Sequence, residues 1–460
     1  MILKKNITKV FYIFLFLHLF LWVFVPSISN TNLPLDTIEA LAWGTNLEWG
    51  FNKHPPFSAF VINIFYNVFG SNDWAYYLLS QICLIISFLF VWEFSKNFFS
   101  NRILSFLSIL ILEGIVFFNY TTPEFNVYVC QLPLKAALVY FFWRGINNIN
   151  LKYWIIVGVL SGIGILTHYS FIFIILALLF YFIFFYKKNI KTVKYFLISF
   201  FTFILVLTPH FFWLFDNSFE TVNYALNRSN VENKILLDHI SNPIVFLGKQ
   251  VLMLIIFFLL FFSLLSFKNY KKLSFKKSNK KILFLLSINL LPLIFVLLIS
   301  LITGAKIRTM WMSTFYLFFG VMFFYYFLNL INFKRVKNFI FLVAFFFLLS
   351  PITYMYISFN SDTKRTDWPG KEIARLVQNK WDDNFTNEIN IVVGDERAAG
   401  NLSYHLKGRP TYFHDLKGRS SEIKINQGVI YTGDPKVLKK VCPGVYGTIR
   451  PYGYCMIGKR

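Results

Sequence analysis

The chain has 460 residues, of which 56% are hydrophobic and 21% aromatic, and its mean hydropathy is +0.55. This composition excludes an ordinary soluble protein of this size. The net charge of +23 does not indicate a nucleic-acid-binding protein. Such proteins gather their charge on one soluble face, whereas most of the lysines and arginines outside the C-terminal tail lie in short links between apolar runs.

The polar links alternate in character along the chain. The basic links are Lys4–Lys5, 96–102, 144–152, 187–194, 268–281 and 334–337. The other links, which hold most of the acids, histidines and Trp-rich stretches, are 36–54, 119–124, 167–168, 216–239 and 303–311. Basic links stay on the cytoplasmic side of a membrane and contact its anionic lipids. The second set is therefore predicted to lie together on the outer face, which becomes the candidate active side.

Eleven apolar segments approach the roughly 20 residues that a spanning helix needs. They lie at about 8–26, 74–95, 103–119, 124–143, 152–167, 169–186, 193–213, 243–266, 282–302, 311–331 and 338–358. An odd number puts the two ends of the chain on opposite sides of the membrane, and the basic links place the N-terminus in the cytoplasm and the C-terminus outside. Lysines precede the first segment, as in a signal peptide, but no small-residue cleavage site follows it, so we expect an uncleaved helix.

The last hundred or so residues are polar, and their patterns predict a small outer α/β domain. Residues 388–394 and 428–432 are typical of short buried strands, and 371–379 has helical spacing. Two domains are therefore expected, a transmembrane catalytic domain at 1–358 and an extracytoplasmic α/β domain at 359–460.

The four cysteines divide by place. Cys83 and Cys130 lie in apolar segments, where cysteine usually packs as a small hydrophobic residue. Cys442 and Cys455 lie in the outer domain on either side of a Pro/Gly-rich turn. An oxidising compartment would let them form a disulfide, and two free thiols are the alternative.

The first outer link is long and has two parts. Residues 36–49 have helical spacing but are too short and polar to span, so we expect this helix, rich in Trp, to lie in the interface plane. The turn Lys53-His54-Pro55-Pro56 ends it. The apolar stretch 57–69 is again too short to span and is predicted to be re-entrant or interfacial.

An acid after the first span, a Trp-rich interfacial helix and the Lys-His-Pro-Pro turn together resemble the GT-C glycosyltransferases. The nearest resemblance is to the family of the protein O-mannosyltransferases and the lipid A aminoarabinose transferase. It continues at 119–143, where an acid follows Thr-Pro at the outer start of a span, at 303–311, and at 393–410 in the tail. Two departures bear on the exact substrate: Glu124 stands where many relatives have Asp, and the tail is short with fewer spans than in the aminoarabinose transferase.

The resemblance implies a polytopic α-helical membrane enzyme in the bacterial inner membrane. Its donor would be a sugar on a polyprenyl phosphate, and the enzyme would be a hexosyl- or pentosyltransferase. The acceptor would be lipid A, lipopolysaccharide core or another cell-envelope glycan at the outer face. A protein hydroxyl as acceptor is an alternative, and so is a flippase or transporter of lipid-linked sugars. Besides donor and acceptor, the expected partners are membrane lipids, and no nucleic acid.

The resemblance implies a carboxylate that takes the acceptor's proton as the new bond forms. Asp36 matches the first-loop acid and is the first candidate, although Asp also suits the first turn of any helix. Glu124 follows Pro123 at the outer start of a span and is the second candidate, with a helix-start acid as the alternative. Glu39 shares the helix face of Asp36 and is either its partner or a solvated acid.

The cations of the outer links are predicted to bind the donor phosphate. Lys53 and His54 resemble the family's phosphate-binding turn, and lysine is a good point charge for phosphate; snorkelling at the interface is the alternative. Lys306 and Arg308 lie beside a Trp in an outer link, against the positive-inside tendency, which argues for a reason to keep them.

Two further residues complete the predicted substrate-binding set, and other polar residues are left outside it. Trp43 lies on the interfacial helix, and His168, at the outer end of the fifth span, could reach the site or be satisfied structurally. Glu113 and Lys135, in adjacent antiparallel segments, are predicted to form a buried ion pair rather than to take part in catalysis.

No cofactor is expected. A divalent metal among Asp36, Glu39, His54 and Glu124 is possible but not predicted, because no dedicated spacing such as HExxH is present. Two other functional classes compete with an enzyme. A transporter would place its polar residues near the midplane between repeated halves, which this sequence does not do. A non-catalytic scaffold with the outer domain as a binding module is excluded less firmly.

Overall fold

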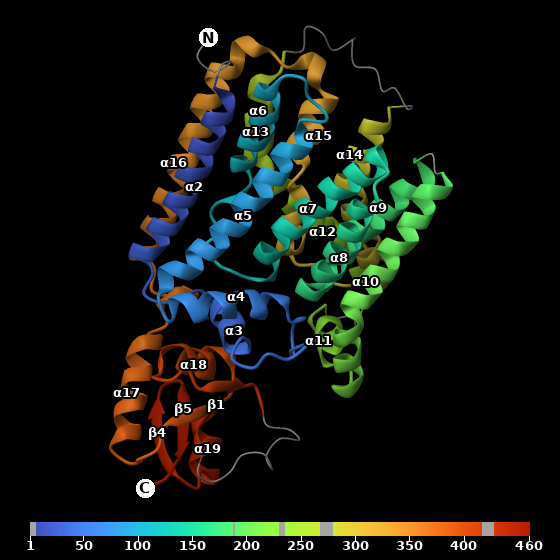
Figure 1. Cartoon of the computed structure of the whole chain (residues 1–460). Coiled ribbons are helices and arrows are strands. Elements are labelled where there is room, and N and C mark those ends of the chain that lie inside the picture. The colour runs from blue at the N-terminus through green and yellow to red at the C-terminus, as the bar shows by residue number, and fades with distance from the viewer. Residues whose placement is uncertain (1–5, 187–188, 230–234, 267–278, 416–426) are drawn as a thin grey trace.

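The computed structural model describes residues 6–186, 189–229, 235–266, 279–415 and 427–460. A long helical bundle forms one end of the molecule and a small sheet domain the other, with short helices between them (Figure 1). Lys4–Lys5, most of the link 268–281 and part of the link 216–239 lie outside the described residues, so the expectations for them are not addressed by the structure.

Within the described residues, five helices are long and apolar enough to cross a membrane. They are α2 (Ile7–Ser29), α5 (Asp73–Ser95), α10 (Ile190–Asp216), α14 (Lys280–Thr303) and α16 (Val336–Asn360). A sixth is formed if α12 (Asp238–Met253) and α13 (Ile255–Leu264), which meet at a bend of 50°, make one span. The chain is thus a multi-span membrane protein, as the sequence predicts.

The expected number of eleven spans is not confirmed. The segment expected at 103–119 is the short helix α6 (Arg102–Leu110) followed by 3₁₀ turns η1 (Ile111–Gly114) and η2 (Val116–Phe118). The segment expected at 311–331 is likewise broken. It consists of η5 (Thr309–Tyr316), α15 (Phe319–Tyr326) and η6 (Leu328–Leu330), and the turn η7 (Phe333–Arg335) leads into α16.

The remaining bundle helices are α7 (Val127–Asn148), α8 (Leu151–Thr167) and α9 (Ile172–Phe184), with the turn η3 (Tyr169–Phe171) before α9. Two glycines one turn apart bring α8 against α10. A Cβ on Gly158 would lie 2.3 Å from the Ser199 carbonyl oxygen, and one on Gly162 would lie 2.6 Å from Val206 Cγ1. Small residues at this spacing let membrane helices pack closely. This contact sets the course of α10, whose C-terminal end leads to the candidate site.

The predicted ion pair between Glu113 and Lys135 is wrong. The α-helix ends at Leu110, so Glu113 lies in a 3₁₀ turn and its Oε1 is 2.9 Å from Nδ1 of His18 on α2. Lys135 instead hydrogen-bonds the Thr314 hydroxyl, and its Nζ lies 3.3 Å from the centroid of the Phe315 ring. The break in the helix therefore redirects the acid away from α7.

Two short helices lie across the end of the bundle, between it and the sheet domain (Figure 1). The helix expected at 36–49 is α3 (Leu35–Trp43), which ends earlier than the spacing predicts. The stretch 57–69 is α4 (Phe57–Phe69), a helix of 13 residues and too short to span. A third short helix, α11 (Glu220–Arg228), follows the outer end of α10.

The sheet domain has five strands in the order β2-β1-β3-β5-β4. They are β1 (Ile389–Val393), β2 (Thr411–Phe413), β3 (Gly428–Gly433), β4 (Val445–Ile449) and β5 (Tyr452–Ile457). β1 is parallel to β2 and β3, whereas β5 is antiparallel to β3 and β4. The helical elements are η8 (Arg365–Asp367), α17 (Gly370–Asp382), the π-helical turn η9 (Glu396–Gly400), α18 (Asn401–His405) and α19 (Pro435–Val441). The two predicted strands and the predicted helix are present.

The cysteines behave as predicted. A disulfide joins Cys442, just after α19, to Cys455 in β5. Cys83 and Cys130 are buried and free. The bridge ties the last helix, which buries none of its residues, to the sheet.

Candidate functional site

The N-terminus of α3 and the loop before α7 bring two acids together. The backbone N–H of Asp36 donates to Glu124 Oε1 at 3.3 Å, and the Thr37 hydroxyl donates to the Phe125 carbonyl at 3.1 Å. These two bonds hold the loop against the first turn of α3. The first and second catalytic candidates, which are far apart in the sequence, are therefore neighbours.

Arg365 completes this pair from the start of the sheet domain. Its Nη1 lies 3.1 Å from Asp36 Oδ1. Burial raises the pKa of Asp36, and Arg365 opposes that rise. Burial and, to a lesser degree, the neighbouring Asp36 charge raise the pKa of Glu124 to about 8. Two interacting carboxyls of this kind titrate as a unit. With a pKa of about 8, Glu124 carries a proton near neutral pH, and Arg365 beside Asp36 favours the ionised form of Asp36.

Lys53 is held between two carboxylates. Its Nζ lies 2.6 Å from Glu39 Oε2 and 2.9 Å from Glu396 Oε1, and 21% of its side chain is exposed. Burial lowers the pKa of Lys53, but the two acids outweigh burial and raise it above its usual value. Burial raises the pKa of Glu39 to about 8, although Lys53 opposes this. The lysine thus joins α3 to η9 of the sheet domain, and its charge is already compensated.

His54, His168 and Trp43 form an aromatic group next to Lys53. The ring centroid of His54 lies 5.3 Å from that of His168 and 5.8 Å from that of Trp43. Burial, with His168 and Lys53 adding to it, lowers the pKa of His54 well below its usual value, so this ring is neutral at pH 7. His168 Nδ1 accepts a hydrogen bond from the Ser170 backbone N–H at 3.1 Å, which caps η3. These three residues come together as expected, although His54 is neutral and thus not a phosphate cation.

Lys306 and Arg308 lie in the connection after α14, which ends at Gly304 with a left-handed φ of 66°. Both side chains are exposed, and neither has a hydrogen bond or ion pair among the described residues. The Lys306 backbone N–H donates to the Ser229 carbonyl at 3.2 Å, which ties this connection to the end of α11. These two cations are free to meet an anion.

Arg228, at the end of α11, faces the same place. It lies within electrostatic reach of Asp36 and His54. The Tyr128 hydroxyl at the start of α7 is within reach of Asp36, Arg308 and Arg228 alike. Like Arg308, Arg228 is exposed and has no hydrogen bond or ion pair in the part of the chain that the structure describes. Two unpaired cations, Arg228 and Arg308, therefore lie around Tyr128, and Arg228 is also close to Asp36.

Sequence reasoning missed three residues of this site. Arg228 is an arginine in an outer link, so the argument that singled out Arg308 also applies to it. Glu396 stands in the tail motif that carries the resemblance, but nothing local indicates that it contacts Lys53. Arg365 has no signal of its own, because only the folded domain brings it to Asp36.

Among the described residues, no group of three or more His, Cys, Asp or Glu side chains could hold a metal ion. The residues considered for a metal contact other groups instead of facing one common point. Glu39 is bound to Lys53, Glu124 contacts the backbone of Asp36, and His54 packs against His168.

Comparisons with known proteins point to one fold. Residues 53–213 match the model of the dolichyl-phosphate-mannose-protein mannosyltransferase family. The structure is similar to that of ArnT from Cupriavidus metallidurans bound to undecaprenyl phosphate, with a TM-score of 0.62, 11% identity and 98% of both chains covered. The apo form of that protein gives a TM-score of 0.63 at 10% identity, again with 98% of both chains covered. No curated protein matches the chain in sequence. The predicted resemblance is confirmed, and the fold is that of the GT-C glycosyltransferases.

Proposed function

We propose that this chain, which has the fold of the GT-C glycosyltransferases, transfers a sugar from a polyprenyl-phosphate donor to an acceptor at the outer face of a bacterial inner membrane. The observation that carries the proposal is the partly buried pair of Asp36 and Glu124 with unpaired cations near it. Such a site joins a base to an anion-binding surface, which is what transfer from a lipid phosphate requires.

The reaction follows from this arrangement. Asp36 takes the proton of the acceptor hydroxyl as its oxygen bonds to the anomeric carbon of the sugar. The bond from that carbon to the phosphate oxygen breaks, and the lipid phosphate leaves with the electron pair. Arg308, Lys306 and Arg228 stabilise the charge that develops on this phosphate. Glu124, protonated near neutral pH, keeps the second carboxyl from repelling Asp36 and the phosphate.

Lys53 has a different part in this proposal from the one predicted from its sequence motif. Its ammonium contacts Glu39 and Glu396, so a phosphate would have to displace at least one of them. We propose that Lys53 fixes the turn that carries His54 and docks the sheet domain, while the free cations bind the donor.

Three possible roles differ in their products: transfer of the sugar to a glycan, transfer to a protein, and transport of the intact lipid-linked sugar. The leading acceptor is a cell-envelope glycan such as lipid A or lipopolysaccharide core, and a protein hydroxyl is the second candidate acceptor. A flippase would move the lipid-linked sugar without cleaving it. The short helices α3 and α11, which carry Asp36 and Arg228, lie at one end of the bundle rather than at its middle (Figure 1), which favours transfer over transport.

The test is an assay of the purified protein in detergent with a polyprenyl-phosphate sugar and envelope glycolipid. The expected result is acceptor-dependent release of free polyprenyl phosphate. Combining Asp36→Asn with Glu124→Gln should abolish release. Asp362→Asn, which changes an exposed acid near Arg365, should leave it intact. Intact donor after long incubation, with sugar moved across a vesicle membrane, would replace the proposal by the flippase.

A further inference from the structure

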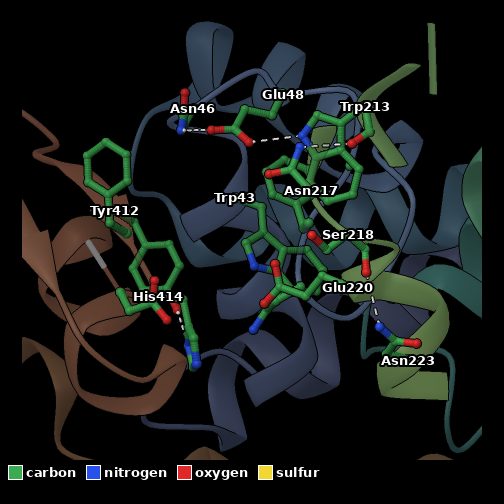
Figure 2. A pocket seen from close by; sticks show the side chains of 15 residues that line it. Trp43, Asn46, Glu48, Trp213, Asn217, Ser218, Glu220, Asn223, Tyr412 and His414 are labelled. Atoms are coloured by element: carbon green, nitrogen blue, oxygen red, sulfur yellow. Dashed lines mark hydrogen bonds between the residues drawn. The ribbon is translucent and has the colours of Figure 1, made fainter. Parts of the chain in front are cut away.

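A cavity of about 570 Å³ opens where three outer segments meet. Its walls come from the connection between α3 and α4, the connection between α10 and α11, and the end of β2 (Figure 2). Trp43 lies in its wall at the end of α3 opposite to Asp36. The carboxyl pair and the three free cations do not line this cavity, so the proposed reaction leaves it unexplained.

The chemistry of the described lining disfavours an anion and favours a carbohydrate. Trp43, Trp213 and Tyr412 supply aromatic surface, and four asparagines supply amide donors and acceptors. Three carboxylates, among them Glu48 and Glu220, line the cavity, and no lysine or arginine of the described residues does. Aromatic faces receive the apolar face of a sugar ring, and amides and carboxylates bind its hydroxyls. A protonated amine would gain a charge-assisted hydrogen bond, whereas a phosphate or carboxylate would be repelled.

Part of the lining is held in place before any ligand arrives. Trp213 Nε1 donates to Glu48 Oε2 at 3.2 Å, and Asn46 Nδ2 donates to Glu48 Oε1 at 2.7 Å (Figure 2). The indole of Trp213 lies on Gly50, where an added Cβ would be 2.2 Å from Trp213 Cε3. Glu220, by contrast, has no hydrogen bond or ion pair among the described residues. The cavity thus combines an aromatic wall that is held in place with the Glu220 carboxylate, which can accept a hydrogen bond from a ligand.

The distance to the reaction centre follows from helix geometry. Trp43 stands seven residues after Asp36 on α3, which corresponds to about 10 Å along the helix axis. Glu220 stands eight residues before Arg228 on α11, which corresponds to about 12 Å. A ligand in the cavity therefore does not touch the reacting atoms, but a longer glycan can extend from one site to the other.

We propose that this cavity is a subsite for a neutral or amino-bearing sugar of a glycan acceptor, remote from the bond that forms. The proposal rests on the proposed function for its place in catalysis. It selects a glycan over a protein as the acceptor, and a sugar without phosphate or carboxylate as the occupant of this subsite.

A thiol-protection experiment tests the cavity without knowing the full acceptor. Ser218 is exposed in the lining, and Ser218→Cys introduces a thiol there. The native cysteines do not compete, because Cys83 and Cys130 are buried and Cys442 is bridged to Cys455. The rate of maleimide labelling is measured in the full-length protein with glucosamine, glucose or glucuronate up to about 100 mM, a range that detects weak binding. Asp216→Cys, an exposed site outside the lining, is the matched control.

The expected order of protection is glucosamine, then glucose, with none from glucuronate and none for Asp216→Cys. Adding Glu220→Gln to Ser218→Cys should weaken protection by glucosamine about tenfold and leave glucose unchanged, because one charge-assisted hydrogen bond is lost. Equal protection by glucuronate, or none by any sugar, overturns the subsite. Protection without donor cleavage would leave the subsite standing while the proposed transferase function fails, and cleavage without protection would do the reverse.

Discussion

At the scale of single residues, the site separates three uses of charge. Asp36 and Glu124 are neighbours whose burial raises both pKa values, and Glu124, with a pKa of about 8, keeps its proton near neutral pH. Lys53 is compensated by two acids, whereas Arg308 has none among the described residues. The first arrangement suits proton transfer, the second suits structure, and the third suits binding of an anion.

Asp36→Asn distinguishes a base from a helix-start acid. It keeps the shape of the side chain and removes the basic oxygen, so turnover should fall by roughly 10²- to 10⁴-fold, the usual contribution of general-base catalysis. Asparagine serves as well as aspartate at a helix start, so a merely structural acid would tolerate the change. The measurement is kcat with donor binding as the control, which should stay nearly intact. Turnover near that of the unmodified protein would transfer the base role to Glu124.

The dependence of turnover on pH should report the ionisation of Asp36 and of Glu124. Below the pKa of Asp36 both carboxyls are protonated and no base is present, so activity is lost as pH falls. Above about pH 8 Glu124 also ionises, and its charge opposes both Asp36 and the donor phosphate. A bell-shaped profile is therefore expected. Glu124→Gln mimics the protonated acid and should remove the alkaline limb while keeping the acid limb; an unchanged alkaline limb would show that another group causes it.

Replacing Arg308 and replacing Lys53 should have different effects. Arg308→Ala removes an exposed phosphate ligand, so KM for the donor should rise by about 10- to 100-fold with the melting temperature unchanged. Lys53→Met leaves Glu39 and Glu396 facing each other without a cation, which should destabilise the protein by up to about 3 kcal/mol.

Adding Glu396→Gln to Lys53→Met relieves that repulsion and should recover part of the melting temperature, as measured by thermal unfolding in detergent. If Lys53→Met instead raised KM with unchanged stability, the phosphate-binding role predicted from the sequence would stand.

At the scale of elements, the close contact of α8 and α10 positions the outer site. Gly158→Ala would place its Cβ 2.3 Å from the Ser199 carbonyl oxygen, a backbone atom that cannot move alone. The helices must separate, and the outer end of α10, which carries Trp213 and leads into α11, must shift with them. We expect a lower melting temperature and weaker donor binding.

Gly248→Ala is the matched control, because nothing lies within 4 Å of a Cβ at this helical glycine. It should be neutral or slightly stabilising, since alanine favours a helix more than glycine does. Equal behaviour of the two variants would mean that the packing of α8 on α10 does not hold the site.

At the scale of the whole molecule, the sequence predicts what depends on composition and periodicity. Long apolar runs and basic links predict the bundle, the helical spacing of 36–49 predicts α3, and short apolar runs predict β1 and β3. The apolar stretch that forms α4 is predicted as a segment too short to span. Helix breaks inside apolar segments, such as that at Ile111, are not visible in hydropathy, because 3₁₀ and α turns bury the same residues. Local sequence patterns also do not predict contacts between distant segments, such as that of Lys53 with Glu396.

The orientation of the molecule in the membrane rests on the basic links and remains the broadest prediction. It places the N-terminus in the cytoplasm and the sheet domain outside, where Asp36, Arg308 and Arg365 would meet a lipid-linked donor. A reporter enzyme that works only outside the cytoplasm, fused after Arg460, should be active. The disulfide gives an independent readout, since it forms in an oxidising compartment. Mass mapping of unreduced protein from cells should recover the peptides of Cys442 and Cys455 linked. An active cytoplasm-only reporter together with two alkylatable thiols would place the domain inside and move the proposed chemistry to the other face.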